Sequence, residues 1–359
     1  MESTEEDSMS EKMKVVAIVD DKKVEIKEIK KPVAHPHQII MKVHGCSICT
    51  FEQRMFLGVA HVPYPFVGGH EVFGEVDSIG SLVDPKTYPI GQKIVGRLLN
   101  ACGECYYCRK GESAHCVNQN KIQDDQFEIA GLGGLAEYVA LDSKQVFKVS
   151  NDTTLEVGVF AEPLACVLKS FEIGRPEMGD DIVVLGGGIM GQLHILLGKM
   201  NGCRVILSEP DPVRREHAMA LGCDLTINPL ETNPVEYVKS VTEGRGAEVV
   251  FNATAIPAVA QQAIDMTASL GRCIMYSTIM PDKPLEVSGK MLHNTGKILT
   301  GTVNPSVESF FKASNMISKK IVDPSSLIYS TYDLDNAQKA FEDAIDPKTM
   351  RCVIKFNGK

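Results

Sequence analysis

The 359-residue chain predicts an α/β protein with a β-rich part and a part built on a doubly wound parallel sheet. Up to about residue 150, apolar residues form short alternating runs broken by Gly and Pro, which is typical of short strands. After about Leu155, apolar strand-length runs alternate with helix-length segments, which indicates a parallel sheet covered on both faces. A glycine-rich turn at 186–191 joins the first of these strands to a helix.

The first part is expected to span residues 13–154, after a flexible acidic tail at 1–12. Its predicted strands are Met13–Val19, Val24–Ile29, Gln38–Val43, Glu71–Ile79, Lys93–Leu98 and Leu135–Val139. Residues 301–359 are expected to return to this domain with a helix at Val307–Ser318 and a strand at Arg351–Phe356. The chain would therefore consist of one domain interrupted by another.

The inserted domain is expected at residues 155–300. Its predicted strands lack polar alternation, as strands buried on both faces do. They are Ile182–Leu185, Arg204–Ser208, Leu225–Ile227, Val249–Asn252, Cys273–Ser277 and Ile298–Thr302.

Composition narrows the class of partner. A net charge of −9 and a pI near 5.6 argue against nucleic acid or an anionic membrane as the main partner. No apolar run reaches the length of a membrane span, and the acidic N-terminus lacks the apolar core of a signal peptide or anchor. Eleven cysteines in such a chain suggest a reducing cytoplasm and metal-bound thiolates rather than disulfides.

The glycine-rich turn predicts a dinucleotide site, because glycines there admit a tight turn and close approach of a pyrophosphate to a helix N-terminus. The expected contacts are Gly186, Gly188, Ile189, Met190 and Gly191. The next strand ends at Glu209, where an acid bonds the adenosine ribose hydroxyls and repels a 2′-phosphate. NAD is therefore favoured over NADP. Arg214 either stacks on the adenine or is a surface helix residue.

Two sets of metal-ligand residues lie in the first part. Cys102, Cys105, Cys108 and Cys116 form a CxxCxxCx7C pattern, and an all-thiolate set of this kind is a closed structural zinc site. The second set is His70-Glu71 with Cys49 about twenty residues upstream, a mixed set that leaves a coordination position open for a substrate. The alternative for the four thiols is a lobe, at about 98–120, that has lost its metal.

Together these motifs resemble the zinc-containing medium-chain alcohol dehydrogenases, in the branch of the sorbitol (polyol) and L-threonine dehydrogenases. The resemblance covers about residues 13–356 and rests on five patterns: GHExxGxxxxxG from Gly69, the four-cysteine lobe, GGxAEY from Gly133, Ala161-Glu162-Pro163-Leu164-Ala165, and GxGxxG. It implies a GroES-like catalytic domain interrupted by a Rossmann domain, with two zinc ions per chain and NAD. It also implies a homodimer or homotetramer acting on a small-molecule alcohol.

Carried over residue by residue, the resemblance assigns the catalytic zinc to Cys49, His70, Glu71 and Glu162. Glu71 and Glu162 are alternatives for the carboxylate bound directly to the zinc. Glu71 resembles the third ligand, and Glu162 either completes the set of four or bonds a zinc-bound water. Cys46 is the competing thiol. Cys49 is preferred because it closes the Ser47-Ile48-Cys49 element, and Cys46 is then a packed core thiol.

The chain departs from the family after Cys49. Relatives commonly continue with Gly-Ser-Asp or Gly-Thr-Asp and then a histidine, whereas this chain continues Thr50-Phe51-Glu52-Gln53-Arg54. Phe51 occupies the position of the hydroxyl group that relays the proton in relatives. Thr50, Glu71 or Glu162 would then carry the proton in its place. The alternative role of Phe51 is simply to shape the substrate pocket. Arg54 would suit an anionic or polyhydroxylated substrate, or be a surface arginine.

The resulting hypothesis is an NAD- and zinc-dependent oxidation of a secondary alcohol in a polyol, sugar, sugar acid or cyclitol. Zinc lowers the pKa of the alcohol and the nicotinamide takes the hydride. An L-threonine 3-dehydrogenase-like reaction is the nearest rival, weakened by the missing Gly-Thr-Asp-x-His element. A zinc-free reductase or a binding protein with this fold is the third possibility.

Overall fold

A computed structural model describes residues 11–119 and 126–356. Of the tail predicted at 1–12, residues 1–10 lie outside the described residues. Contacts divide the chain into two compact units, one made of Met1–Ala165 and Ser306–Lys359 and the other of Cys166–Pro305. The first division point, after Ala165, falls inside a helix and the second follows Pro305, whereas the sequence suggested boundaries at about 155 and 301.

The second unit is built on one parallel sheet of strand order β12-β11-β10-β13-β14-β15. This is the order of a doubly wound dinucleotide-binding fold. The strands are β10 (Asp181–Leu185), β11 (Arg204–Ser208), β12 (Leu225–Ile227), β13 (Ala247–Asn252), β14 (Thr267–Met275) and β15 (Ile298–Gly301). Their buried aliphatic residues, such as Val183, Ile206 and Val250, form the core of the unit. The predicted Rossmann sheet is confirmed.

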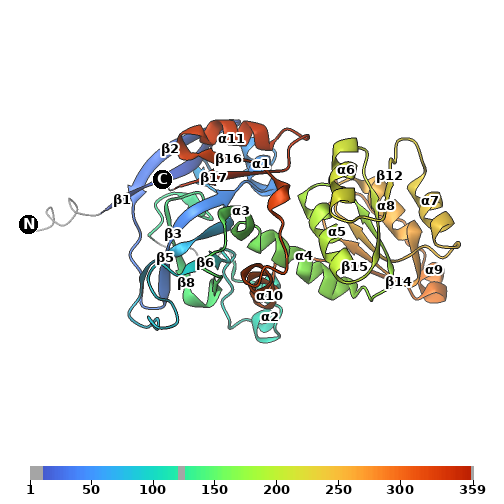
Figure 1. The fold of residues 1–359 in the computed structure, drawn as a ribbon, viewed down its shortest axis with the longest axis horizontal. Helices are drawn as coiled ribbons and strands as arrows, with labels where there is room; N and C mark the ends of the chain where they lie inside the picture. The colour runs from blue at the N-terminus through green and yellow to red at the C-terminus, as the bar shows by residue number, and fades with distance from the viewer. Residues whose placement is uncertain (1–10, 120–125, 357–359) are drawn as a thin grey trace, which may run out of the picture. The chain divides into compact units, whose positions relative to one another are not determined.

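Helices cover both faces of this sheet (Figure 1). They are α5 (Ile189–Met200), α6 (Pro212–Ala220), α7 (Pro234–Val241), α8 (Pro257–Met266) and α9 (Gly289–Thr295), with most of α4 (Ala161–Gly174). In Figure 1, α5 and α6 lie on one side of the strands, and α7 and α8 on the other. The crossovers α5 and α8 each join neighbouring parallel strands, as βαβ units require.

The first unit contains two sheets. The smaller has the order β2-β1-β4-β7, and the larger has the order β16-β17-β3-β5-β6-β9 with β8 beside β3. The strands are β1 (Lys12–Asp20), β2 (Lys23–Lys30), β3 (Gln38–Ser47), β4 (Phe66–Val67), β5 (Glu71–Ile79), β6 (Lys93–Gly96), β7 (Ala130–Gly131), β8 (Tyr138–Asp142), β9 (Val146–Lys148), β16 (Ile328–Asp333) and β17 (Arg351–Lys355). Residues of both sheets, among them Val16, Met41 and Val72, share one buried apolar cluster.

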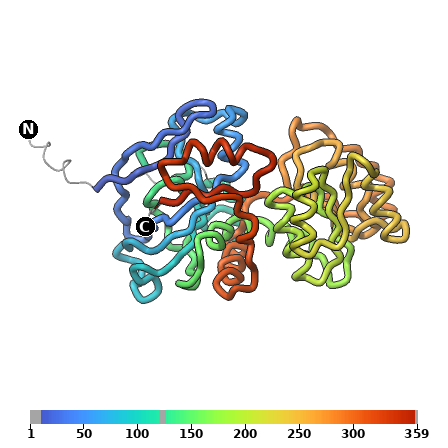
Figure 2. Tube along the Cα trace, turned by 45° about the horizontal axis from the view of Figure 1, so that its top comes forward, coloured from blue at the N-terminus to red at the C-terminus, as the bar shows by residue number. Residues whose placement is uncertain are grey.

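Short helices complete this unit: α1 (Thr50–Phe56), α2 (Tyr106–Arg109), α3 (Leu155–Gly158), α10 (Val307–Ser318) and α11 (Ala337–Ala344). The C-terminal segment lies beside N-terminal strands, since β17 pairs with β3 (Figure 2). Strand β16 and helix α11 were not predicted. Nowhere in the described ranges is a helix long and apolar enough to cross a membrane.

Candidate metal centres and cofactor site

Three potential metal ligands meet at one end of the larger sheet. Cys49 precedes α1 as its N-cap, His70 lies in the turn between β4 and β5, and Glu71 is the first residue of β5. The sulfur, ring-nitrogen and carboxylate atoms of these three side chains lie within 4.8 Å of one another. Both His70 and Glu71 are buried, so the donors face a site largely closed to solvent.

Glu52, which the sequence analysis did not single out, holds two of these ligands in place. Its side chain is fully buried in α1. One carboxylate oxygen accepts from the backbone N–H of Gly69 at 2.9 Å and lies 3.1 Å from Nδ1 of His70. The other accepts from the N–H of Cys49 at 3.1 Å. A carboxylate on Nδ1 fixes the ring so that Nε2 is the nitrogen available to a metal.

The charge around His70 favours a cation. Burial lowers the pKa of His70, but the Glu52 carboxylate and the Cys49 thiol raise it, and the net value lies well above the ordinary one. Burial also raises the pKa of Glu52, but the attraction of His70 and the Gly69 N–H bring it below its ordinary value. A metal ion bound to the imidazole would be stabilised by the same negative groups that stabilise a proton there.

Arg351, the second residue missed from the sequence, neutralises part of the acidic charge. It starts β17, and the register places Val353 opposite Ser47, which in turn lies opposite Glu71. A guanidinium nitrogen of Arg351 stands 2.9 Å from one oxygen of Glu71, while the Ser47 hydroxyl bonds the other. The sequence offered only a weak signal, an arginine that opens the predicted strand Arg351–Phe356.

The acids outnumber the cations here. Burial lowers the pKa of the Arg351 guanidinium, but the surrounding acidic side chains raise it above its ordinary value: Glu71, Cys49, Glu162 and Glu52. Four acidic groups therefore act on one buried arginine, and a divalent cation would offset the excess. The Cys/His/carboxylate set also has the composition of a zinc site with an open position. The residues present thus fit the zinc ion that the sequence predicted.

The other candidates differ in position. Glu162 is buried in the first turn of α4 and acts on Arg351, yet it is outside the described three-residue cluster. Thr50 is exposed at the start of α1. Cys46 is also outside the cluster: burial raises the pKa of its thiol well above the ordinary value, and its sulfur lies 3.5 Å from the carbonyl of Ser47.

The two pocket candidates lie on α1. The ring of Phe51 meets His70 edge to face, with ring centroids 5.9 Å apart, and is 42% exposed. Its phenyl group therefore stands beside the metal cluster with a free face. Arg54 lies in the last turn of α1 and is half-buried.

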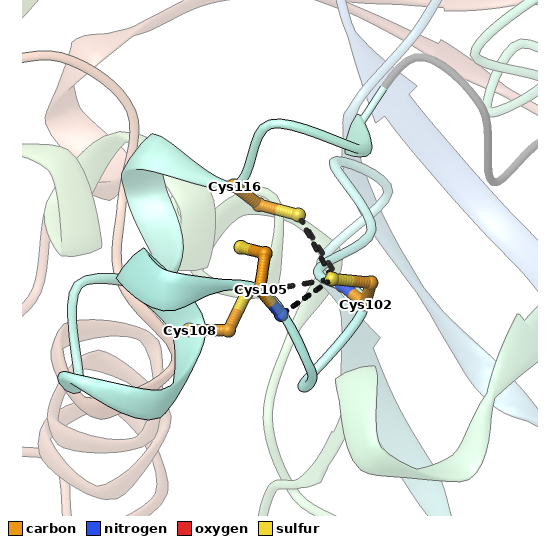
Figure 3. Close-up of side chains that lie close together, drawn as sticks. All are labelled: Cys102, Cys105, Cys108 and Cys116. Atoms are coloured by element: carbon orange, nitrogen blue, oxygen red, sulfur yellow. Dashed lines mark hydrogen bonds between the residues drawn. The ribbon is translucent and has the colours of Figure 1, made fainter.

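The four thiols of the predicted lobe come together (Figure 3). Cys102 lies in a loop, Cys105 caps α2, Cys108 lies within α2, and Cys116 follows a short 3₁₀ turn. Their sulfurs lie within 4.8 Å of one another, with Cys102 and Cys116 3.6 Å apart. Sulfurs bound to one zinc at about 2.3 Å stand about 3.8 Å apart. All eleven cysteines lie in the described part of the chain, and none of them forms a disulfide.

The backbone favours the thiolate form of Cys102 and Cys105, whereas burial raises the pKa of the Cys108 thiol to about 12. The N–H groups of Glu104 and Cys105 lower the pKa of Cys102 to about 6, so this sulfur is ionised at neutral pH, the form that binds zinc. The lobe is tied to the C-terminal part of its unit where Ser113 accepts from the N–H of Val307 at 3.1 Å. These contacts fit a structural metal.

The dinucleotide candidates lie where β10 ends. A Cβ at Gly191 would stand 1.9 Å from the carbonyl oxygen of Gly186, so only glycine allows α5 to begin this close to the turn. Glu209 is buried after β11, and its carboxylate accepts from the N–H of Gly187 at 2.6 Å and of Asp211 at 2.9 Å. Arg214 approaches the same carboxylate at 4.0 Å. Ile189 and Met190 form the first turn of α5.

Comparison with known proteins agrees with this geometry. Residues 35–151 match the family described as alcohol dehydrogenase GroES-like domain, and residues 190–319 match zinc-binding dehydrogenase. The chain is 28% identical over 355 residues to L-threonine 3-dehydrogenase of Pyrococcus horikoshii, covering 96% of this chain and 99% of that one. It is 28% identical over 328 residues to 2-dehydro-3-deoxy-L-galactonate 5-dehydrogenase of Pseudoalteromonas atlantica, covering 90% and 92%.

The fold is similar to that of a solved alcohol dehydrogenase from Thermus sp. ATN1. That structure superposes with a TM-score of 0.86 at 22% identity, covering 96% of this chain and 99% of the other. The predicted resemblance is therefore confirmed. The chain belongs to the zinc-containing medium-chain alcohol dehydrogenases, in the polyol and threonine dehydrogenase-like branch, and is an oxidoreductase that works with zinc and a nicotinamide dinucleotide.

Proposed function

We propose that the protein oxidises a secondary alcohol of a polyol, sugar, sugar acid or cyclitol, with NAD as the hydride acceptor. The observation that carries the proposal is the cluster of Cys49, His70 and Glu71, whose ligand atoms lie within 4.8 Å of one another. When bound, zinc at this cluster supplies a Lewis acid for the substrate oxygen, and NAD supplies the acceptor for the hydride. The four-thiol lobe would hold a second, structural zinc.

The protein's own residues orient this chemistry. Glu52 holds the ring of His70, and Arg351 with Ser47 holds the carboxylate of Glu71. Phe51 offers an apolar surface next to His70 and has no hydroxyl to carry a proton. The proton released from the alcohol would therefore leave through Thr50 or through a carboxylate, Glu71 or Glu162, by way of water.

NAD is preferred to NADP because of Glu209. Its buried carboxylate is held by two backbone N–H groups at the end of β11. A 2′-phosphate placed beside it would meet a fixed negative charge. Nearby Arg215 donates to the carbonyls of Glu209 and Pro210 and so is turned to the backbone.

L-Threonine 3-dehydrogenation is the second candidate. It is favoured by the relative named L-threonine 3-dehydrogenase, which matches across 99% of its own length. The sequence after Cys49 weakens it, since Thr50-Phe51-Glu52 stands in place of Gly-Thr-Asp. The sugar-acid relative supports the first candidate at the same 28% identity.

A substrate screen decides between these functions. Formation of NADH or NADPH would be followed by its absorbance, with the zinc-loaded protein and neutral polyols, cyclitols, aldonates or L-threonine, each offered with NAD or NADP. We expect turnover with a member of the first three classes, and a higher kcat/KM with NAD than with NADP. Turnover confined to L-threonine would transfer the proposal to the second candidate. No reduction of either nucleotide with any of the four classes would contradict both.

We also propose a reducing compartment such as the cytoplasm, because the eleven cysteines, all within the described residues, form no disulfide and four of them form the lobe cluster. Assembly as a homodimer or homotetramer is expected from the family resemblance.

A further inference from the structure

Gly68 lies just before the turn that contains His70. Glycine is needed at position 68 because there is no room for a side chain, not because of the backbone conformation. Its φ lies outside the left-handed region that favours glycine, so its backbone suits any residue. A Cβ added at Gly68, however, would stand 2.7 Å from Cγ of Glu52 and 3.1 Å from a carboxylate oxygen of that residue. Real Cβ atoms essentially never approach a neighbour as closely as 2.7 Å. Either position 68 lacks a side chain or Glu52 moves.

Glu52 is poorly placed to move. Its side chain is fully buried, and its two oxygens are engaged by three groups: the N–H of Cys49 at 3.1 Å, the N–H of Gly69 at 2.9 Å and Nδ1 of His70 at 3.1 Å. A displacement of the carboxylate by a few tenths of an ångström weakens all three contacts together, since hydrogen bonds weaken with distance and angle. Two of the three belong to metal-ligand residues.

We propose that Gly68 and Glu52 are a size-matched pair whose fit sets the position of the carboxylate on His70, and with it the retention of zinc at the Cys49/His70/Glu71 cluster. Glu52 is a positioning residue for His70, and Gly68 acts through Glu52. This inference rests on the proposed function in one respect, that zinc binds at this cluster.

The pair predicts that the effect of alanine at position 68 depends on Glu52. Alanine at position 52 has no atom beyond Cβ, so Glu52→Ala removes the Cγ that the new methyl group at position 68 would strike. Gly68→Ala should therefore weaken zinc binding in the natural chain and have no further effect in the Glu52→Ala chain.

Zinc release to a chromogenic chelator tests this in the full-length, zinc-loaded protein, with zinc per chain measured by elemental analysis. The phase of zinc release that is absent in Cys49→Ser is assigned to the cluster. The remaining phase, zinc release from the lobe, is an internal control in every variant. We expect Gly68→Ala and Glu52→Ala each to speed release from the cluster about 10- to 100-fold, the usual effect of losing an outer carboxylate on a metal-bound histidine. Gly289→Ala is the matched control, because nothing lies within 4 Å of a Cβ there.

The double variant Gly68→Ala/Glu52→Ala should release cluster zinc at the rate of Glu52→Ala alone, while release from the lobe stays unchanged. A double variant in which Gly68→Ala speeds release by the same factor as in the natural chain, or a Gly68→Ala protein that keeps cluster zinc like the natural chain, would overturn the pairing. If Gly68→Ala fails to fold, the double variant still decides, because without Cγ of Glu52 the methyl group meets no conflict there and the double variant should fold as Glu52→Ala does. A natural protein that holds zinc only in the lobe would instead contradict the proposed function itself.

Discussion

Arg54 lies in the last turn of α1, one helical turn beyond Phe51, whose ring contacts His70. An arginine in this position can offer a fork of donors to a carboxylate, which a lysine cannot reproduce. At the residue scale, this side chain is the feature most suited to separate an anionic from a neutral substrate. The relative that acts on a sugar acid makes the distinction worth measuring.

We predict that Arg54→Ala raises KM for a sugar acid about tenfold or more, because a hydrogen bond to a charged group contributes about 1.5–3 kcal/mol. The KM for a neutral polyol should change by less than about twofold, since surface substitutions usually have small effects. Steady-state kinetics with both substrates provides the measurement, and Arg54→Lys, which keeps the charge but not the fork, is the control. Equal small changes for both substrates would assign Arg54 to the protein surface.

Two residues of the candidate site show what sequence reasoning could not reach. Cys49, His70 and Glu71 were predicted from their spacing and resemblance. Glu52 and Arg351 depend on tertiary structure, since Glu52 is placed by the first turn of a short helix and Arg351 by the pairing of β17 with β3. Their spacing along the chain carries no trace of the contacts that Glu52 makes with His70, or Arg351 with Glu71.

At the scale of elements, α5 contains a buried histidine whose described contacts include no acidic side chain. His194 is fully buried; its Nδ1 lies 2.7 Å from the carbonyl of Met190 and its Nε2 3.0 Å from the hydroxyl of Ser170. The rings of Phe251 and Tyr276 contact it. Burial lowers the pKa of His194 to about 4. The neutral ring therefore donates from Nδ1 and accepts at Nε2.

This lowered pKa makes the second unit sensitive to acid. An unfolded histidine has a pKa of about 6.5, so between about pH 6.5 and pH 4 the unfolded chain binds a proton that the folded one does not. The contribution of His194 to stability is complete above pH 6.5 and falls as the pH drops through that window. The total loss is about 3 kcal/mol, at about 1.4 kcal/mol per pKa unit.

Urea unfolding of the full chain at several pH values, compared with His194→Gln, measures this effect. The glutamine retains a group that can bond Ser170 but does not titrate, so its free energy of unfolding should fall less between pH 6.5 and pH 4 than that of the natural protein. Carboxylates common to both proteins cancel in the difference. Parallel pH profiles would show that His194 does not drive the loss.

At the scale of the whole molecule, the periodicity of the sequence predicted the parallel sheet closely. The predicted strand Arg204–Ser208 has the bounds of β11, and in the first unit Glu71–Ile79 has those of β5. These runs are dense in buried β-branched residues, so local pattern and tertiary burial agree. The alternation of β-rich and α/β texture likewise predicted a fold in two parts.

The C-terminal region was harder to predict. Helix α11 buries Ala337, Ala340, Phe341 and Ala344 at helical spacing, but three of these four are alanines, which carry little hydrophobic signal. Strand β16 has its side chains partly or fully exposed, so it lacks the apolar run that marks a strand. Both elements are set by tertiary packing, since β16 pairs with β17, and α11 contacts β17 and, from the other end of the chain, β2.

The measurement closest to the central claim is zinc content set against activity in two cysteine variants of the purified protein. We predict two zinc ions per chain in the natural protein. Cys49→Ser should retain one and lose NAD-dependent oxidation, because its sulfur belongs to the mixed cluster. The matched variant Cys46→Ser, altered at a buried thiol outside that cluster, should retain both ions and most of the activity. A Cys49→Ser protein that oxidises substrate at the natural rate, or a natural protein fully active after zinc is removed from the cluster of Cys49, His70 and Glu71, would contradict the account.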